Sequence, residues 1–144
     1  MIPVCEDTGN LPPGIHWAAW EEIVESFGTN ETRRNFLQGL RVAMEILHAA
    51  GCETIYIDGS FVTSKENPAD FDCCWDIDGV ILELLDPVLM DFSNKRAAQK
   101  AKFGGEFFPN LQEQDPELGI LKWFQRDKNT GAEKGILAID LGNL

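Results

Sequence analysis

The sequence IYIDGSFVT at residues 55–63, followed by Asp70-Phe71-Asp72, decides the fold of this chain. It is typical of a strand, a tight Gly-Ser turn and a further strand that carries two carboxylates. Side chains alternate along a strand, so Asp70 and Asp72 are expected to point to the same face. Two like charges this close are costly unless a cation lies between them. The segment therefore predicts a hard divalent ion, Mg²⁺ first of all, beside a turn that can receive phosphate.

The spacing of apolar residues predicts the elements around this segment. Helices are expected at about 17–27, where Trp17 belongs to the apolar face, and at about 30–50. A strand at 53–58 then leads into the Gly-Ser turn and a second strand at 61–63. After a polar loop, the strand with the two carboxylates is expected to span 70–75.

The second half of the chain is less regular, but its order of elements is still readable. A short helix is expected at 80–85 and a strand or helical turn at 88–92. The remaining elements are a basic helix at 94–102 capped by Ser93, a strand at 106–108 closed by Pro109, a helix that starts at Pro116, and a last strand at 136–141. This order predicts an α/β or α+β fold with a small mixed sheet flanked by helices.

Length and charge restrict the possible functions. The chain has 144 residues, which fits a single domain over residues 1–144. Its formal net charge is -12, although its 44% hydrophobic and 25% charged residues are ordinary for a globular protein. Broad coating of nucleic acid is excluded by this charge, because it needs many cations that neutralise phosphates.

The four cysteines indicate reduced thiols. No CxxC spacing occurs among them, which argues against a zinc site; they are Cys5, Cys52, Cys73 and Cys74. We expect buried, reduced cysteines in a cytoplasmic protein. The first residues lack the basic and apolar regions of a signal peptide, and no apolar run is long enough to span a membrane.

The predicted metal and turn match the needs of phosphoryl transfer. Two metal ions about 4 Å apart clamp the attacking and leaving oxygens in such reactions. Carboxylates hold these ions, and backbone N–H groups with little side-chain bulk receive the phosphates. Gly59-Ser60 supplies that backbone and adds one hydroxyl donor.

The Gly-Ser turn between a strand and an Asp-x-Asp strand resembles the nucleotidyltransferase superfamily typified by DNA polymerase beta. It is particularly similar to the small bacterial members, the minimal nucleotidyltransferases that often work in toxin–antitoxin or defence pairs. The sequence from Asp58 through Asp72 is also similar to that of a group of uncharacterised bacterial proteins assigned to that fold. The resemblance implies a nucleotidyltransferase-like fold for the whole chain.

The resemblance also implies roles for individual residues. Gly59 and Ser60 would hold the β- and γ-phosphates of a nucleotide, and Asp70 and Asp72 would ligate Mg²⁺, or Mn²⁺ as the alternative. A third catalytic carboxylate is expected on a later strand. Glu106 is favoured for this position and as a metal ligand, because it follows a helix on a plausible strand, and Asp91 is the alternative.

Four cations are candidates for nucleotide binding. Arg96 and Lys100 are four residues apart and share one face of the basic helix, so both could neutralise a triphosphate. Lys65 lies between the Gly-Ser turn and the acidic strand, and Lys134 is a weaker candidate. The basic run could equally be a solvated helix face. Asp58 is expected to fix the turn through local hydrogen bonds.

The leading hypothesis is a Mg²⁺-dependent nucleotidyltransferase that moves NMP from an NTP to a hydroxyl on a protein or tRNA. The acidic composition favours a protein acceptor or partner, since RNA would need a strong basic face. With little chain beyond the minimal fold, a partner protein or a second copy would contribute acceptor recognition. The first alternative is a catalytically inactive module that acts as a binding partner or antitoxin. The second is an unrelated metal-binding α/β protein.

Overall fold

A five-stranded mixed sheet organises the chain, for which a computed structural model describes residues 1–111 and 119–144. Across the sheet the order is β1-β5-β2-β3-β4. The pairs β1/β5 and β3/β4 are parallel, whereas β2 is antiparallel to both of its neighbours. The strands are β1 (Gly14–Trp17), β2 (Thr54–Asp58), β3 (Asp72–Asp76), β4 (Glu106–Asn110) and β5 (Gly135–Asp140). The predicted mixed α+β class with a small sheet is confirmed.

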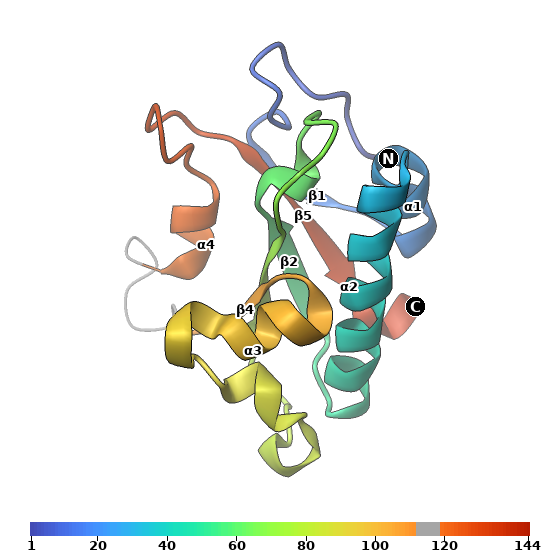
Figure 1. Ribbon diagram of the computed structural model, residues 1–144, viewed down its shortest axis with the longest axis vertical. Helices are drawn as coiled ribbons and strands as arrows, with labels where there is room; N and C mark the ends of the chain where they lie inside the picture. The colour runs from blue at the N-terminus through green and yellow to red at the C-terminus, as the bar shows by residue number, and fades with distance from the viewer. Residues whose placement is uncertain (112–118) are drawn as a thin grey trace.

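Helices cover both faces of this sheet (Figure 1). They are α1 (Trp20–Phe27), α2 (Glu31–Ala49), α3 (Ser93–Phe103) and α4 (Ile120–Phe124). The longest, α2, begins where the Asn30 side chain accepts a hydrogen bond from the Arg33 N–H at 2.8 Å. Helices α1, α2 and α3 pack on one face of the sheet and α4 on the other.

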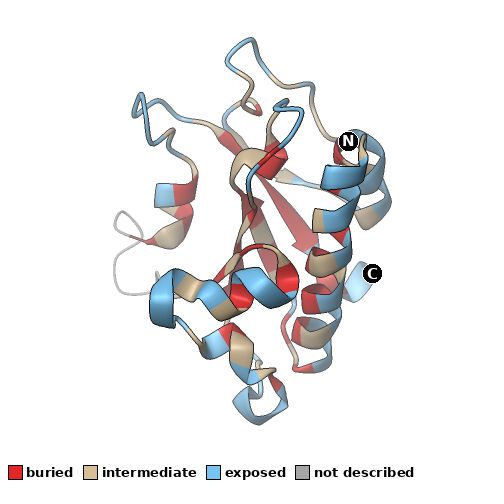
Figure 2. Ribbon diagram, viewed as in Figure 1, coloured by how far each residue is buried: buried red, intermediate tan, exposed pale blue. Residues whose placement is uncertain are grey.

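The alternation of side chains along β3 explains why two cores form. Cys73 belongs to the large cluster under α1, α2 and α3, whereas the next residue, Cys74, belongs to a smaller cluster with Leu121 and Phe124 of α4. Figure 2 shows the resulting burial of the strands between the two layers. All four cysteines are free thiols, which agrees with the reduced cysteines expected from the sequence.

The contact between α2 and α3 depends on one residue without a side chain. A Cβ placed on Gly39 would lie 1.9 Å from the backbone oxygen of Phe103, so only glycine allows the two helices to approach this closely. Phe103 is the last residue of α3, and Glu106 opens β4 shortly afterwards. The crossing of the helices therefore helps to place the start of β4.

The expected helix at 17–27 begins later, at Trp20, because residues 14–17 form strand β1. The pairing of Gly14 with Gly135 and of Trp17 with Ala138 holds this segment at the edge of the sheet. Trp17 is 54% exposed and is not part of the helix's apolar face. Sheet pairing has overridden the helical spacing of the apolar residues here.

The strand expected at 61–63 is also wrong, since Ser60–Val62 forms a single 3₁₀ turn. Phe61 and Val62 are both buried, an arrangement that the alternation of a strand with one covered face does not give. Strand β3 begins at Asp72, so Asp70 lies in the segment that leads into it.

The later elements follow the expected order with shifted boundaries. Short 3₁₀ turns at Leu82–Leu84 and Pro87–Met90 occupy the regions of the expected short helix and turn. Strand β4 continues through Pro109, which an edge strand tolerates because the missing N–H can face away from its neighbour. The expected helix start at Pro116 lies outside the described residues. Among the helices described, none is long and apolar enough to cross a membrane.

Candidate metal and phosphate site

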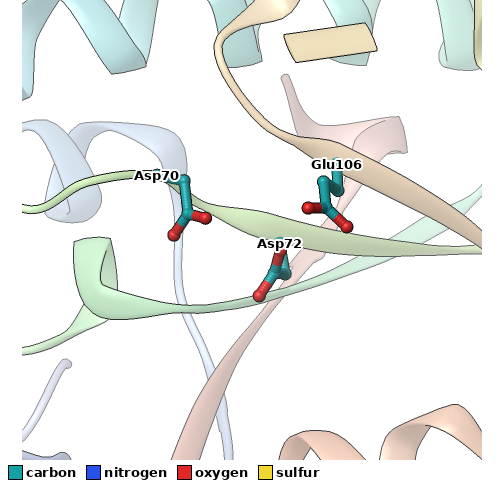
Figure 3. Close-up of side chains that lie close together, drawn as sticks. All are labelled: Asp70, Asp72 and Glu106. Carbon is teal, nitrogen blue, oxygen red and sulfur yellow. The ribbon is translucent and has the colours of Figure 1, made fainter. Parts of the chain in front are cut away.

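Three carboxylates meet at one end of β3 and β4 (Figure 3). Asp70 precedes β3, Asp72 opens β3, and Glu106 opens β4. One oxygen from each lies within 4.8 Å of the others, and all three residues are partly buried. We call these three residues the acid cluster. The sequence had predicted all three as metal ligands, and the structure brings them together.

The parallel pairing of β3 and β4 produces this meeting. Asp72 and Glu106 are direct partners in the register, and the Glu106 N–H donates to the Phe71 carbonyl at 3.1 Å. Adjacent strands lie about 4.8 Å apart, so paired side chains on one face are forced close together. The backbone thus fixes two of the carboxylates, and the Gly-Ser turn places Asp70 beside them.

Asp72 is partly buried among other acidic side chains, and this changes its pKa. Burial raises its pKa to about 7, and the negative charges of Asp70, Asp58 and Glu106 add to the increase, whereas Lys134 opposes it. An all-oxygen donor set of this charge suits a hard divalent cation. Such a cation would let all three carboxylates ionise together.

Arg96 and Lys100 neutralise one member of the acid cluster. Lys100 Nζ lies 3.0 Å from a Glu106 oxygen, and Arg96 Nη1 lies 3.7 Å from the other. The Arg96 guanidinium also stacks over the Phe108 ring at 4.1 Å. Neither cation is among the described residues that line the adjoining cavity, and their contact with a nucleotide stays a prediction.

The direction of Arg96 follows from an unusual backbone. Asn94, Lys95 and Arg96 all have positive φ angles of 51–61°, in the first turn of α3. This conformation costs roughly 1–2 kcal/mol per residue for side chains other than glycine. Ser93 was expected to cap the helix, but its hydroxyl donates to Asp91 Oδ1 at 2.6 Å instead.

Asp91, the alternative third carboxylate, is not part of the acid cluster. Its carboxylate accepts hydrogen bonds from the Ser93 hydroxyl and backbone N–H, which lower its pKa. It ends the 3₁₀ turn that precedes α3. The geometry therefore decides between the two candidates in favour of Glu106.

A cavity of about 630 Å³ opens over Asp70 and Asp72. This volume lies within the range of small-molecule sites, which is about 300–1,000 Å³. Its wall includes Gly59 and Ser60, together with Lys65 and Lys134, two of the cations that the sequence offered for nucleotide binding. Further cations and an aromatic side chain that the sequence did not single out for this role also line it: Arg126, Lys128 and Trp123.

The Gly-Ser turn is shaped around the acid cluster. Gly59 has φ 93° and ψ -178°, a conformation that is essentially restricted to glycine. A Cβ at this position would lie 3.1 Å from the Asp72 backbone nitrogen. The Ser60 hydroxyl accepts from the Ala69 N–H at 3.0 Å and lies 3.4 Å from the Asp70 carbonyl, to which it can donate. The turn and the acidic segment are thus tied directly to each other.

Asp58 and Lys134 form a pair that the sequence did not indicate. Lys134 Nζ lies 2.5 Å from Asp58 Oδ1, and both side chains are at least 85% buried. Burial raises the pKa of Asp58, and the charge of Lys134 lowers it again. Asp58 was expected to act locally in the turn, but its strongest partner is 76 residues away. Only the position of β5 beside β2 could have revealed it.

Arg33 holds the loop that follows the Gly-Ser turn. Its side chain is buried, and its guanidinium donates to the carbonyls of Phe61 and Thr63, each at 2.7 Å, and of Lys65. A weaker contact reaches the Phe27 carbonyl at 3.4 Å. One buried cation from α2 therefore fixes the backbone of the cavity wall that carries Lys65.

Fold and site together define an α+β domain with a three-carboxylate centre beside a glycine turn. Residues 3–140 match the model of a family described as a family of unknown function (DUF6932), and the chain belongs to that family. No curated protein and no solved structure matches the chain.

Proposed function

We propose that this protein is a Mg²⁺-dependent nucleotidyltransferase that moves NMP from an NTP to a hydroxyl on a macromolecule. The acid cluster carries the proposal, because two of its members, Asp70 and Asp72, line the same cavity as the Gly59-Ser60 turn. The donor set fits the metal, because three carboxylates within 4.8 Å supply only hard oxygen ligands. Bound Mg²⁺ would stabilise the charge on the attacking and leaving oxygens.

The residues of the chain have separate tasks in this reaction. Asp70, Asp72 and Glu106 hold the metal, and the backbone at Gly59 and Ser60 faces the phosphates. The acceptor hydroxyl oxygen forms a bond to the α-phosphorus, and the bond from that phosphorus to the bridging oxygen breaks. Pyrophosphate leaves, and the hydroxyl proton passes to a carboxylate of the acid cluster or to water.

Lys134 and Lys65 are the cations placed to neutralise the triphosphate. Both line the cavity, and Lys134 is oriented by its ion pair with Asp58. A fixed ammonium at this point needs little reorganisation when phosphate charge arrives. The net charge of -12 favours a protein over a tRNA as the acceptor.

The test is calorimetric titration with ATP, GTP, CTP and UTP, with and without Mg²⁺ or Mn²⁺. The wild type should bind in a metal-dependent way, and the double variant Asp70→Asn/Asp72→Asn should lose this binding. Asp91→Asn is the matched control, because Asp91 is a nearby acid outside the acid cluster. Equal binding by the wild type and the double variant would rule the site out.

Transfer itself is tested with NTPs labelled at the α-phosphate, incubated with cell protein or with tRNA. Label should appear on one of these acceptors with the wild type and be absent with the double variant. Retention of transfer in the double variant would refute the catalytic assignment.

A second candidate is favoured by the ion pairs of Glu106. Arg96 and Lys100 already neutralise this carboxylate, as they would in a domain that binds without catalysis. The protein would then act as a nucleotide-binding or partner-binding module, for example an antitoxin. Metal-dependent NTP binding without transfer, even with a partner protein present, would favour this candidate.

A further inference from the structure

Trp123 is the exposed aromatic side chain in the wall of the cavity. It is 60% exposed, although it lines the same hollow as Gly59, Ser60 and Asp70. Of the four tryptophans, Trp75 is buried, and neither Trp17 nor Trp20 is among the described residues of this cavity. The Trp123 indole is therefore open to a ligand that enters the cavity beside the Gly-Ser turn.

The position of Trp123 is held by its neighbours on α4. Leu121 and Phe124 are buried in the smaller core, and the Phe124 ring packs edge-on against Phe108 at 5.9 Å. These contacts anchor the helix against the sheet. The Trp123 ring is thereby presented at the cavity without being part of the core, with its centroid 6.0 Å from that of Phe124.

The residues that line the cavity form a polar, charged part and an aromatic part. The Gly-Ser turn, with Asp70 and Asp72, suits the phosphate end of a nucleotide, and Lys65 and Lys134 also line this part of the cavity. Trp123 supplies a flat apolar surface of the kind on which nucleobases stack. It also borders an apolar hollow lined in part by Phe92, Phe108 and Pro109.

We infer that Trp123 is the stacking platform for the nucleobase and sets the base preference of the site. The inference rests on the proposed nucleotide binding and adds the means by which the base is recognised. Because every base has a π-face, stacking alone selects weakly. Purines offer the larger surface, so ATP and GTP should bind a few-fold more tightly than CTP and UTP.

The experiment compares a ligand that has a base with one that lacks it. Wild type, Trp123→Ala, Trp123→Phe and Trp17→Ala are titrated with ATP, CTP and inorganic tripolyphosphate, all with Mg²⁺. Trp123→Ala should weaken ATP binding by about 5- to 100-fold and remove most of the preference for ATP over CTP. Its affinity for tripolyphosphate should stay within about twofold, because that ligand has nothing to stack.

Two further comparisons make the assignment specific. Trp123→Phe should keep most of the affinity. Trp17→Ala, which removes an exposed tryptophan that is not among the described lining residues, should bind as the wild type does. ATP should quench tryptophan emission in Trp17→Phe but not in Trp123→Phe. Unchanged ATP binding in Trp123→Ala, or equal loss of ATP and tripolyphosphate, would overturn the inference.

Failure of the proposed function has a different signature. If ATP and tripolyphosphate both fail to bind the wild type in the presence of Mg²⁺, the nucleotide site and the stacking platform are refuted together. If binding depends on Trp123 but no label is transferred to any acceptor, the stacking inference stands and the transferase assignment fails.

Discussion

Asp72 is the residue whose protonation should link the acid cluster to folding. Its pKa of about 7 in the folded protein lies above the ordinary value of 3.8, so the folded state binds this proton more tightly than the unfolded chain does. The contribution of this proton to the free energy of unfolding is fully present below about pH 4 and is lost as the pH rises through about 7. Asp58 acts in the same direction, since burial also raises its pKa.

We therefore expect the metal-free protein to lose stability between about pH 4 and pH 7, by on the order of 1–2 kcal/mol once solvent screening is allowed for. Urea unfolding in the presence of a chelator measures this. Excess Mg²⁺ should remove the fall, and Asp72→Asn should reduce it while leaving the part that belongs to Asp58. An undiminished fall in Asp72→Asn would show that another group titrates.

Gly59 allows a second prediction at the scale of one residue. Gly59→Ala combines a left-handed backbone with a Cβ only 3.1 Å from the Asp72 nitrogen. We expect a loss of about 2–4 kcal/mol in unfolding free energy and weaker metal binding. Gly131→Ala is the control, because its φ is 75° but nothing lies within 4 Å of the added Cβ.

That control should lose only about 1 kcal/mol, the cost of the backbone conformation alone. The difference between the two variants, measured by urea unfolding, isolates the close approach of the turn to the acid cluster. Equal losses would mean that the space beside Gly59 can relax.

The acid cluster was predictable from sequence, whereas its counter-charges were not. The spacing from Gly59-Ser60 to Asp70 and Asp72 is local, and the order of elements favoured Glu106 while leaving Asp91 as the alternative. The direction of Arg96 depends on positive φ angles in the first turn of α3, which helical spacing does not anticipate. The Asp58–Lys134 pair depends on the order of strands across the sheet, which residue patterns do not encode.

Among the elements, the loop after the Gly-Ser turn depends most on a distant helix. Replacement of Arg33 by Lys keeps the charge but cannot reproduce the planar fork that reaches the Phe61, Thr63 and Lys65 carbonyls. We expect the free energy of unfolding to fall by about 2–4 kcal/mol, because buried carbonyls lose their donors. Urea unfolding checks this.

Arg34→Lys is the matched control on the same helix. Arg34 is exposed, and its guanidinium reaches one carbonyl, that of Gly28, at 3.3 Å. Its replacement should change stability by less than about 0.5 kcal/mol. Similar losses in both variants would contradict the anchoring role of Arg33.

Elements with strong local signals were predicted well, and elements made by pairing were not. Helix α2 has a long apolar stripe and a cap at Asn30, so its identity is local. Strand β1 has only four residues and exists because β5 pairs with it. The 3₁₀ turn at Ser60–Val62 was expected as a strand because Phe61 and Val62 favour strands, but both are buried against the core.

At the scale of the whole molecule, the excess of acids predicts a specific response to cations. The chain has 24 Asp and Glu against 12 Lys and Arg, so screening of repulsion should raise the melting temperature modestly in NaCl. MgCl₂ at matched ionic strength should raise it further, because a site filled at about 100 Kd adds about 2.7 kcal/mol.

The extra effect of MgCl₂ should vanish in Asp70→Asn/Asp72→Asn, whereas the NaCl effect should persist. Thermal unfolding of both proteins in the two salts provides the measurement. If both salts act equally on the wild type, Mg²⁺ is acting only through ionic strength.

The position of β5 affects the order in which the sheet can form during synthesis. It follows every other strand in the sequence, yet it lies between β1 and β2 in the sheet. A ribosome must therefore release the stretch from Lys134 to Asp140 before the two sides of the sheet can join. Until then Asp58 lacks the ammonium that neutralises it. A growing chain can pair β2, β3 and β4 early, but Asp58 receives its counter-charge only after all four of the other strands have been synthesised.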